Sequence, residues 1–184
     1  PQNIKLNRGT MTNLAITELF KLDDISFLKS VVNRYPETKM LAGKAEASPE
    51  GNPNLKDTSL AYKVFVAGEV DPTAVEADRT FLGLLLFKAA LNGDKSKFPN
   101  LSDKNFEELT SFTKKIANTE SDVEFVLYSL ACNDLGKTQN LVDEDVNLFG
   151  RKSDDHDQLL AEVVEKKPEL FAGYQALGEE HKKL

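Results

Sequence analysis

Apolar residues recur every three or four positions along most of the chain, and this spacing predicts a helical protein. The first such stretch covers residues 14–32 and stops before Pro36, because the residue that precedes a proline disfavours helical geometry. Asp23 and Asp24 interrupt the stretch. Since Asp favours the N-cap position, they can begin a second helix within it.

The middle of the chain predicts a long loop followed by a central helix. Residues 43–57 concentrate Gly, Pro, Asn and Ser, which is typical of a loop. Residues 59–68 fit either a helix or a strand. Asp-Pro-Thr at 71–73 resembles a helix start, because proline is tolerated in the first turn. The helix that follows is apolar on several sides, so we expect it to be buried as far as its stop at Asn92-Gly93.

Four more helices are predicted towards the end of the chain. They cover residues 102–117, 119–132, 154–164 and 170–183. In the first of them one apolar face is marked by Phe106, Leu109, Phe112 and Ile116. We therefore expect a single all-α domain of about six to eight helices over residues 11–184. Residues 1–10 precede Met11 and are expected to be disordered or a remnant of the expression vector.

Composition and charge narrow the classes of protein. The 184 residues include 23 Lys and Arg against 30 Asp and Glu, a formal net charge of -7. This balance argues against binding to duplex nucleic acid or to an anionic membrane surface, since both depend on cationic side chains. The longest apolar run, residues 81–87, is too short to span a bilayer. We expect a cytoplasmic protein.

Cys132 is the only cysteine in the sequence. A single cysteine excludes an intramolecular disulfide and a zinc site built from four cysteines. Its apolar surroundings, FVLYSLAC, favour a small buried hydrophobic side chain over a nucleophile.

The segment NDLGK at residues 133–137 is the first candidate for chemistry. It follows the apolar helix at 119–132, so Asn133 and Asp134 can leave the core and face a pocket. Gly136 permits left-handed backbone, and Lys137 places a cation near the helix end. The same residues also suit a plain helix C-cap with no chemistry.

The segment SDDHDQLL at residues 153–160 is the second candidate. Ser153 or Asp154 is expected to cap the helix, and Asp154 and Asp157 are three apart and share a face. His156 points elsewhere. If the segment meets the NDLGK helix end, Asp134, Asp154, His156 and Asp157 can form a carboxylate-rich metal site with a general acid or base beside it.

Two neighbouring segments have simpler interpretations. DEDVN at residues 143–147 is expected to be a solvated loop that links the two candidates. His181 lies three residues from the end of the sequence, in EEHKKL, and is expected in a solvated tail.

The segment ACNDLGK resembles the His-Asp-Leu/Ile-Gly-Lys signature of the HD superfamily of helical metal-dependent phosphohydrolases. Asp134, Leu135, Gly136 and Lys137 match this signature over a stretch of some ten residues. The resemblance implies an HD-like core, a divalent metal and a phosphomonoester or nucleotide as substrate. Asp134 would bind the metal, with Asn133, His156 and Asp157 in support. Lys137 would steady the phosphate, and His156 could move a proton.

The chain departs from the family pattern at its histidines. Asn133 stands where the family has histidine, and no histidine precedes His156. The remaining oxygen ligands favour Mg²⁺, Mn²⁺ or Ca²⁺ over zinc or iron. Two other functions remain open. One is a non-catalytic adaptor whose acidic face binds a protein partner, and the other is a domain that senses a nucleotide without cleaving it.

Overall fold

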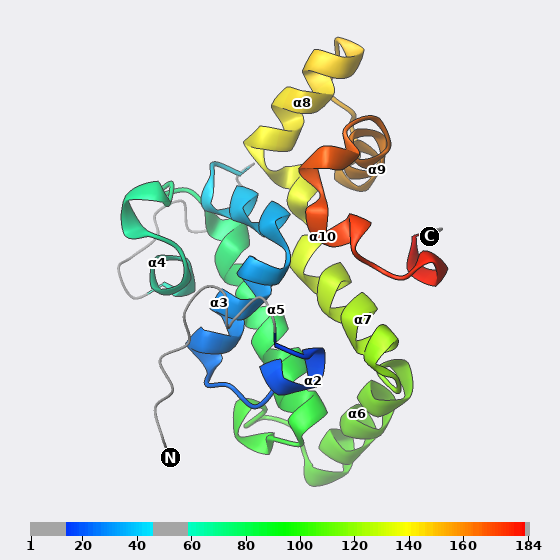
Figure 1. Ribbon diagram of the computed structural model, residues 1–184. Coiled ribbons are helices and arrows are strands. Elements are labelled where there is room, and N and C mark those ends of the chain that lie inside the picture. Colours follow the sequence, from blue (N-terminus) through cyan, green and yellow to red (C-terminus); the bar gives the residue numbers. More distant parts are fainter. Residues whose placement is uncertain (1–13, 46–58, 183–184) are drawn as a thin grey trace.

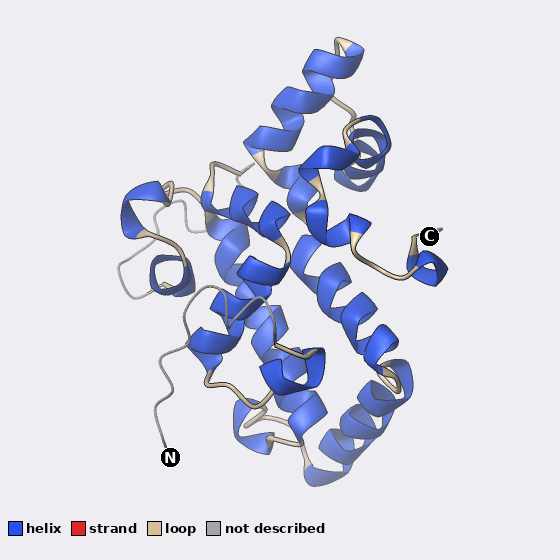
Figure 2. Cartoon of the chain, in the orientation of Figure 1, coloured by secondary structure: helices blue, strands red, loops and turns tan. Residues whose placement is uncertain are grey.

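The computed structural model describes residues 14–45 and 59–182. Within these ranges the chain forms helices joined by loops, and the only strand-like pairing is an isolated bridge between Ala45 and Thr138 (Figure 2). The predicted all-α class is therefore confirmed. No helix in the described ranges is both long and apolar enough to cross a membrane.

Two predictions fall largely outside the described residues. The remnant expected at 1–10 lies outside them, and so do residues 46–57 of the expected long loop.

The first half of the fold is built around one long helix, α5. In chain order the elements are α2 (Ile16–Leu19), α3 (Asp24–Arg34), the 3₁₀ helix η1 (Pro36–Ala42), α4 (Leu60–Val64), the 3₁₀ helix η2 (Ala67–Glu69) and α5 (Val75–Asn92). The segment that fitted either helix or strand, residues 59–68, thus contains the short helix α4 and the start of η2.

The second half consists of four longer helices and several short turns (Figure 1). The longer helices are α6 (Asp103–Ile116), α7 (Glu120–Cys132), α8 (Gln139–Phe149) and α9 (His156–Lys166). The short elements are η3 (Lys95–Lys97), η4 (Leu135–Lys137), η5 (Pro168–Leu170), α10 (Ala172–Gln175) and η6 (Glu179–His181).

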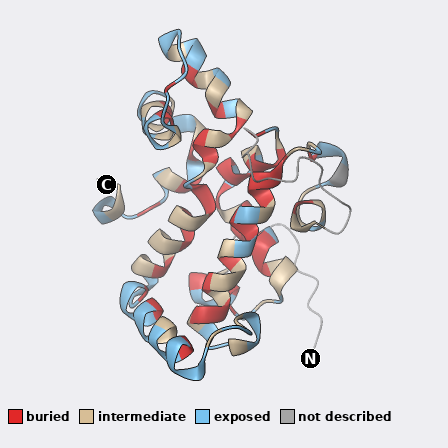
Figure 3. Cartoon of the chain, turned by 180° about the vertical axis from the view of Figure 1, so that it is seen from behind, coloured by how far each residue is buried: buried red, intermediate tan, exposed pale blue. Residues whose placement is uncertain are grey.

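The helix α5 is the centre of the core, as its apolar sequence predicted. It contacts α3, α4, α6 and α7, and its buried side chains include Phe81, Leu84 and Phe87. Figure 3 shows buried residues concentrated along these central helices. Removing a side chain of this size from water stabilises a fold by about 1.5–3 kcal/mol. Hydrophobic burial around α5 therefore holds the helices together.

Several helix boundaries follow from local capping chemistry. Asp23 caps α3 by accepting a hydrogen bond from the backbone N–H of Ser26 at 2.9 Å. Thr119 and Asp122 form a reciprocal capping box at the start of α7. The helix α5 ends at Gly93, whose φ of 70° is favourable only for glycine. The predicted division of the stretch at residues 14–32 into two helices and the predicted stop of α5 are confirmed.

One prediction in the middle of the chain is wrong. The Asp71 side chain accepts hydrogen bonds from the backbone N–H and the hydroxyl of Thr73, so residues 71–73 form a turn and α5 begins at Val75. The helix predicted at residues 102–117 is confirmed as α6. Its apolar face is only half buried, because Phe112 is 61% exposed and Ile116 is 42% exposed.

The end of the chain also differs from its prediction. DEDVN lies inside α8, where Leu141 and Asp145 are buried four residues apart on one face. The single helix expected over residues 170–183 is broken into η5, α10 and η6. The breaks lie at Phe171, between η5 and α10, and at residues 176–178, where Gly178 is the N-cap of η6.

Candidate functional site

The two segments singled out in the sequence meet in the structure. The helix α7 ends at Cys132, and η4 then brings Gly136 against the first residue of α9. A Cβ atom on Gly136 would collide with the backbone carbonyl oxygen of His156. The expectation of left-handed backbone at Gly136 is wrong, since only Gly93 and Gly150 have positive φ in the described ranges. The glycine instead permits close contact between two backbones.

His156 lies between two carboxylates that come from both segments. Its Nε2 atom is 3.6 Å from Asp134 Oδ1 and 3.3 Å from Asp157 Oδ1. The His156 side chain is 38% exposed and that of Asp134 is 24% exposed, so solvent reaches the cluster. The expectation that His156 points away from Asp157 is wrong, because the imidazole turns towards both acids.

Lys137 connects this cluster to a buried acid. Its ammonium nitrogen is 3.1 Å from Asp134 Oδ1 and 3.9 Å from Glu76 Oε2. The Glu76 side chain is 1% exposed, and its Oε2 atom has no hydrogen-bond partner. Arg79 lies 3.5 Å from Glu76 Oε1. Lys137 is therefore held between two carboxylates and positions Asp134.

Sequence reasoning missed the role of Glu76. An acid in the first turn of α5 looks like an ordinary partner for the helix dipole. Only the approach of Lys137 from η4, some sixty residues later, makes it part of a network.

The residue that caps α9 differs from the one expected in the segment SDDHDQLL. Asp155, and not Ser153 or Asp154, caps α9 by accepting the backbone N–H of Asp157 at 2.8 Å. Asp154 precedes the helix and is exposed. Asp155, His156 and Asp157 each offer one ligand atom, and these atoms lie within 4.8 Å of one another. Asp155 thus takes the place expected for Asp154.

Asn133 lies at the edge of a groove beside this cluster. It is the exposed C-cap residue of α7, and its backbone N–H donates to Ser129 O. The groove has a volume of about 540 Å³ and runs between α7, α9 and the C-terminal segment. Asn133 and Asp157 both line it, so the cluster adjoins a cavity of the size that small ligands occupy.

The C-terminal segment forms one wall of the groove. The expectation of a solvated tail is wrong for His181, whose side chain is only 14% exposed. Its ring stacks on Phe125 with ring centroids 4.5 Å apart, and its Nε2 atom is 3.0 Å from Ser121 Oγ. The Tyr174 hydroxyl donates to Lys182 O at 2.6 Å and fastens the end of the segment.

A buried carboxylate lies beneath the groove. Glu37 of η1 accepts hydrogen bonds from the Tyr128 hydroxyl at 3.1 Å, from Gly173 N at 2.8 Å and from Tyr174 N at 3.1 Å. Burial, with the nearby charge of Glu37, raises the pKa of the Cys132 thiol well above its usual value. These effects favour the protonated thiol, which agrees with the expected small buried hydrophobic side chain.

The fold and this site define an all-α protein with a carboxylate–imidazole cluster at the end of an aromatic groove. The chain belongs to the family of unknown function DUF6829, whose model matches residues 53–183. No curated protein and no solved structure matches the chain.

Proposed function

We propose that the cluster binds a divalent metal ion through Asp134, His156 and Asp157, with Asp155 in support, and that the protein hydrolyses a phosphomonoester or nucleotide there. The observation that carries the proposal is the position of His156 Nε2 between two carboxylates from separate segments. A cytoplasmic location is part of the same proposal.

The spacing of the ligand atoms fits a metal ion. Metal–ligand bonds of about 2.0–2.2 Å place neighbouring ligand atoms about 3–3.5 Å apart. The two distances from His156 Nε2, 3.3 and 3.6 Å, require only small adjustments. Carboxylates with one imidazole favour Mn²⁺ over Mg²⁺ and Ca²⁺, because the last two prefer oxygen alone.

The charges of the cluster also favour a cation. Asp134, Asp155 and Asp157 are three acids, and the nearby Lys137 is already shared with Glu76. A phosphate group entering this site would meet excess negative charge. A bound divalent ion would neutralise that charge, hold phosphoryl oxygens and lower the pKa of a water molecule.

The remaining residues then take distinct roles in the proposal. Lys137 positions Asp134, and its side chain, which is 29% exposed, is assigned the second role of contacting a phosphate. Asn133 lies on the groove side, where its amide can hydrogen-bond a substrate. His156 Nε2 cannot both bind a metal and move a proton, and its position between the acids favours the role of ligand.

Isothermal titration calorimetry with Mn²⁺, Mg²⁺ and Ca²⁺ tests the metal site. We expect Mn²⁺ to bind the wild type, and Asp134→Asn to weaken this binding at least about tenfold, because a ligand and a charge are lost. Asp154→Asn is the matched control and should bind as the wild type does, since Asp154 lies outside the cluster. A wild type that binds none of the three ions contradicts the proposal.

A panel of phosphomonoesters and nucleotides, assayed with Mn²⁺, tests the reaction. We expect product that Asp134→Asn abolishes. Metal binding without product, together with a rise in the melting temperature on addition of a nucleotide, would favour a sensing domain.

A second candidate function is an adaptor that binds a protein partner. It is favoured by Phe112 and Ile116 on α6, which expose apolar side chains four residues apart on the surface. Hydrolysis of a phosphoester that is lost in Asp134→Asn would argue against the adaptor function.

A further inference from the structure

The groove between α7 and α9 is lined by one continuous stripe from each helix. The residues of both stripes are spaced by three and four, which places them on one helical face. The stripe of α7 consists of Phe125, Tyr128, Ser129, Cys132 and Asn133, and that of α9 consists of Asp157, Leu160, Ala161, Val164 and Glu165.

Carboxylates stand at both ends of the α9 stripe. Asp157 and Glu165 are eight residues apart, which is about 12 Å along a helix. Both are exposed, and the residues between them on this face are the apolar Leu160, Ala161 and Val164. Among the described residues, no Lys or Arg lines the groove.

Aromatic side chains also line the groove. Phe125, Tyr128 and Tyr174 line the cavity, and the rings of the two tyrosines lie 6.0 Å apart. Aromatic faces attract cations as well as apolar groups. The groove therefore offers an apolar middle, aromatic side chains in its lining, and a carboxylate at each end of its α9 stripe.

We propose that this groove binds a linear organic diamine. The hydrocarbon chain lies along Leu160 and Val164 opposite Tyr128, and the two ammonium groups reach Asp157 and Glu165. The spacing of the two acids suits a chain of about eight carbons. This site does not depend on the proposed metal, although Asp157 belongs to both.

The first experiment compares three eight-carbon probes by calorimetry in a buffer that contains EDTA. They are 1,8-diaminooctane, 1,8-octanediol and octanedioate, which differ only in their end groups. We expect the diamine to bind at least about fivefold more tightly than the diol, and the diacid most weakly, because only the ammonium groups pair with the carboxylates. The proposal is overturned if the diol or the diacid binds as tightly as the diamine. It is also overturned if none of the three probes binds, and another occupant, such as a peptide, would then be sought for the groove.

The second experiment uses charge variants on and off the groove. Glu165→Gln should weaken the diamine about fivefold and leave the binding of any diol unchanged. Glu169→Gln is the matched control, since Glu169 is exposed just after α9 and does not line the groove. Equal losses in both variants would mean general attraction to an acidic protein, and the groove site would be rejected.

The same variants separate this proposal from the metal site. Glu165 is not among the proposed metal ligands, so Mn²⁺ binding should be unchanged in Glu165→Gln. Failure of the diamine experiment leaves the metal proposal intact, and failure of Mn²⁺ binding leaves the diamine proposal intact.

Discussion

At the scale of single residues, Gly136 shows how one missing side chain allows the candidate site to form. The backbone of η4 lies so close to the start of α9 that a methyl group would meet the His156 carbonyl. Neither side of this contact is a flexible side chain that can move away. The position of His156 beside Asp134 therefore depends on glycine.

We expect Gly136→Ala to lower the free energy of unfolding by about 1–3 kcal/mol, because the two backbones must separate. Gly83→Ala is the control, since Gly83 lies inside α5 with open space around it. That change should raise stability by up to about 1 kcal/mol through helix propensity. Urea denaturation of both variants measures the difference, and equal effects would contradict the assigned role of Gly136.

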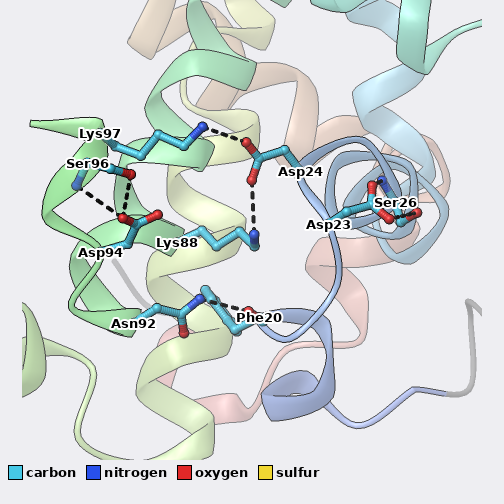
Figure 4. Close-up of polar contacts among 9 residues, drawn as sticks. All are labelled: Phe20, Asp23, Asp24, Ser26, Lys88, Asn92, Asp94, Ser96 and Lys97. Carbon is cyan, nitrogen blue, oxygen red and sulfur yellow. Dashed lines mark hydrogen bonds and ion pairs between the residues drawn. The ribbon is translucent and has the colours of Figure 1, made fainter. Parts of the chain in front are cut away.

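At the scale of elements, one acid links three helices. Asp24 in the first turn of α3 accepts hydrogen bonds from Lys88 of α5 at 3.0 Å and from Lys97 of η3 at 2.9 Å (Figure 4). Asn92 adds a hydrogen bond of 2.8 Å to Phe20 O at the same junction. Desolvation acts to raise the pKa of Asp24, but the two lysines outweigh it and hold this pKa below the ordinary 3.8.

Because the pKa of Asp24 is lower in the folded protein than in the unfolded chain, its carboxylate stabilises the fold at pH values above the unfolded-state pKa. This stabilisation is lost as the pH falls through the folded-state pKa. We expect Asp24→Asn to cost about 1 kcal/mol at pH 7 and progressively less below pH 3.8. Denaturation midpoints measured across this pH range test the expectation.

Glu18→Gln provides the comparison, because both side chains of the Glu18–Lys21 ion pair are exposed to solvent. Its cost should stay within about 0.5 kcal/mol at every pH. A cost of Asp24→Asn that does not change with pH would argue against the ion pairs as its cause.

At the scale of the whole molecule, Glu37 joins segments far apart in the chain. It lies in η1 and accepts hydrogen bonds from Tyr128 of α7 and from the backbone at the start of α10. Its side chain is buried, so solvent cannot replace these bonds. The wall of the groove formed by α10 therefore depends on a residue from the first quarter of the sequence.

We expect Glu37→Gln to lower the free energy of unfolding by about 2–3 kcal/mol, because one of the two oxygens that accept the three hydrogen bonds is replaced by an NH2 group, which cannot accept. Amide hydrogen exchange at Gly173 and Tyr174 should speed up together with the fall in stability. Glu69→Gln, at an exposed acid of η2, should change neither quantity measurably. Unchanged exchange at the two amides of α10 in Glu37→Gln would contradict the role of Glu37.

The sequence by itself determined most helices and several of their ends. The Thr119–Asp122 capping box and the left-handed Gly93 are local, since the groups that interact lie within a few residues of each other. It also identified the two segments that meet at the candidate site. Its resemblance to the HD superfamily stays a prediction, because the family to which the chain belongs has no known function.

Only the tertiary structure decided which polar residues work together. Glu37, Glu76 and His181 look like surface residues in the sequence, yet all three are largely buried against partners tens of residues away. Phe112 shows the reverse, since it belongs to a regular apolar stripe on α6 and its side chain is nevertheless 61% exposed. The physical reason is that capping depends on neighbours in the chain, whereas burial depends on where distant helices pack.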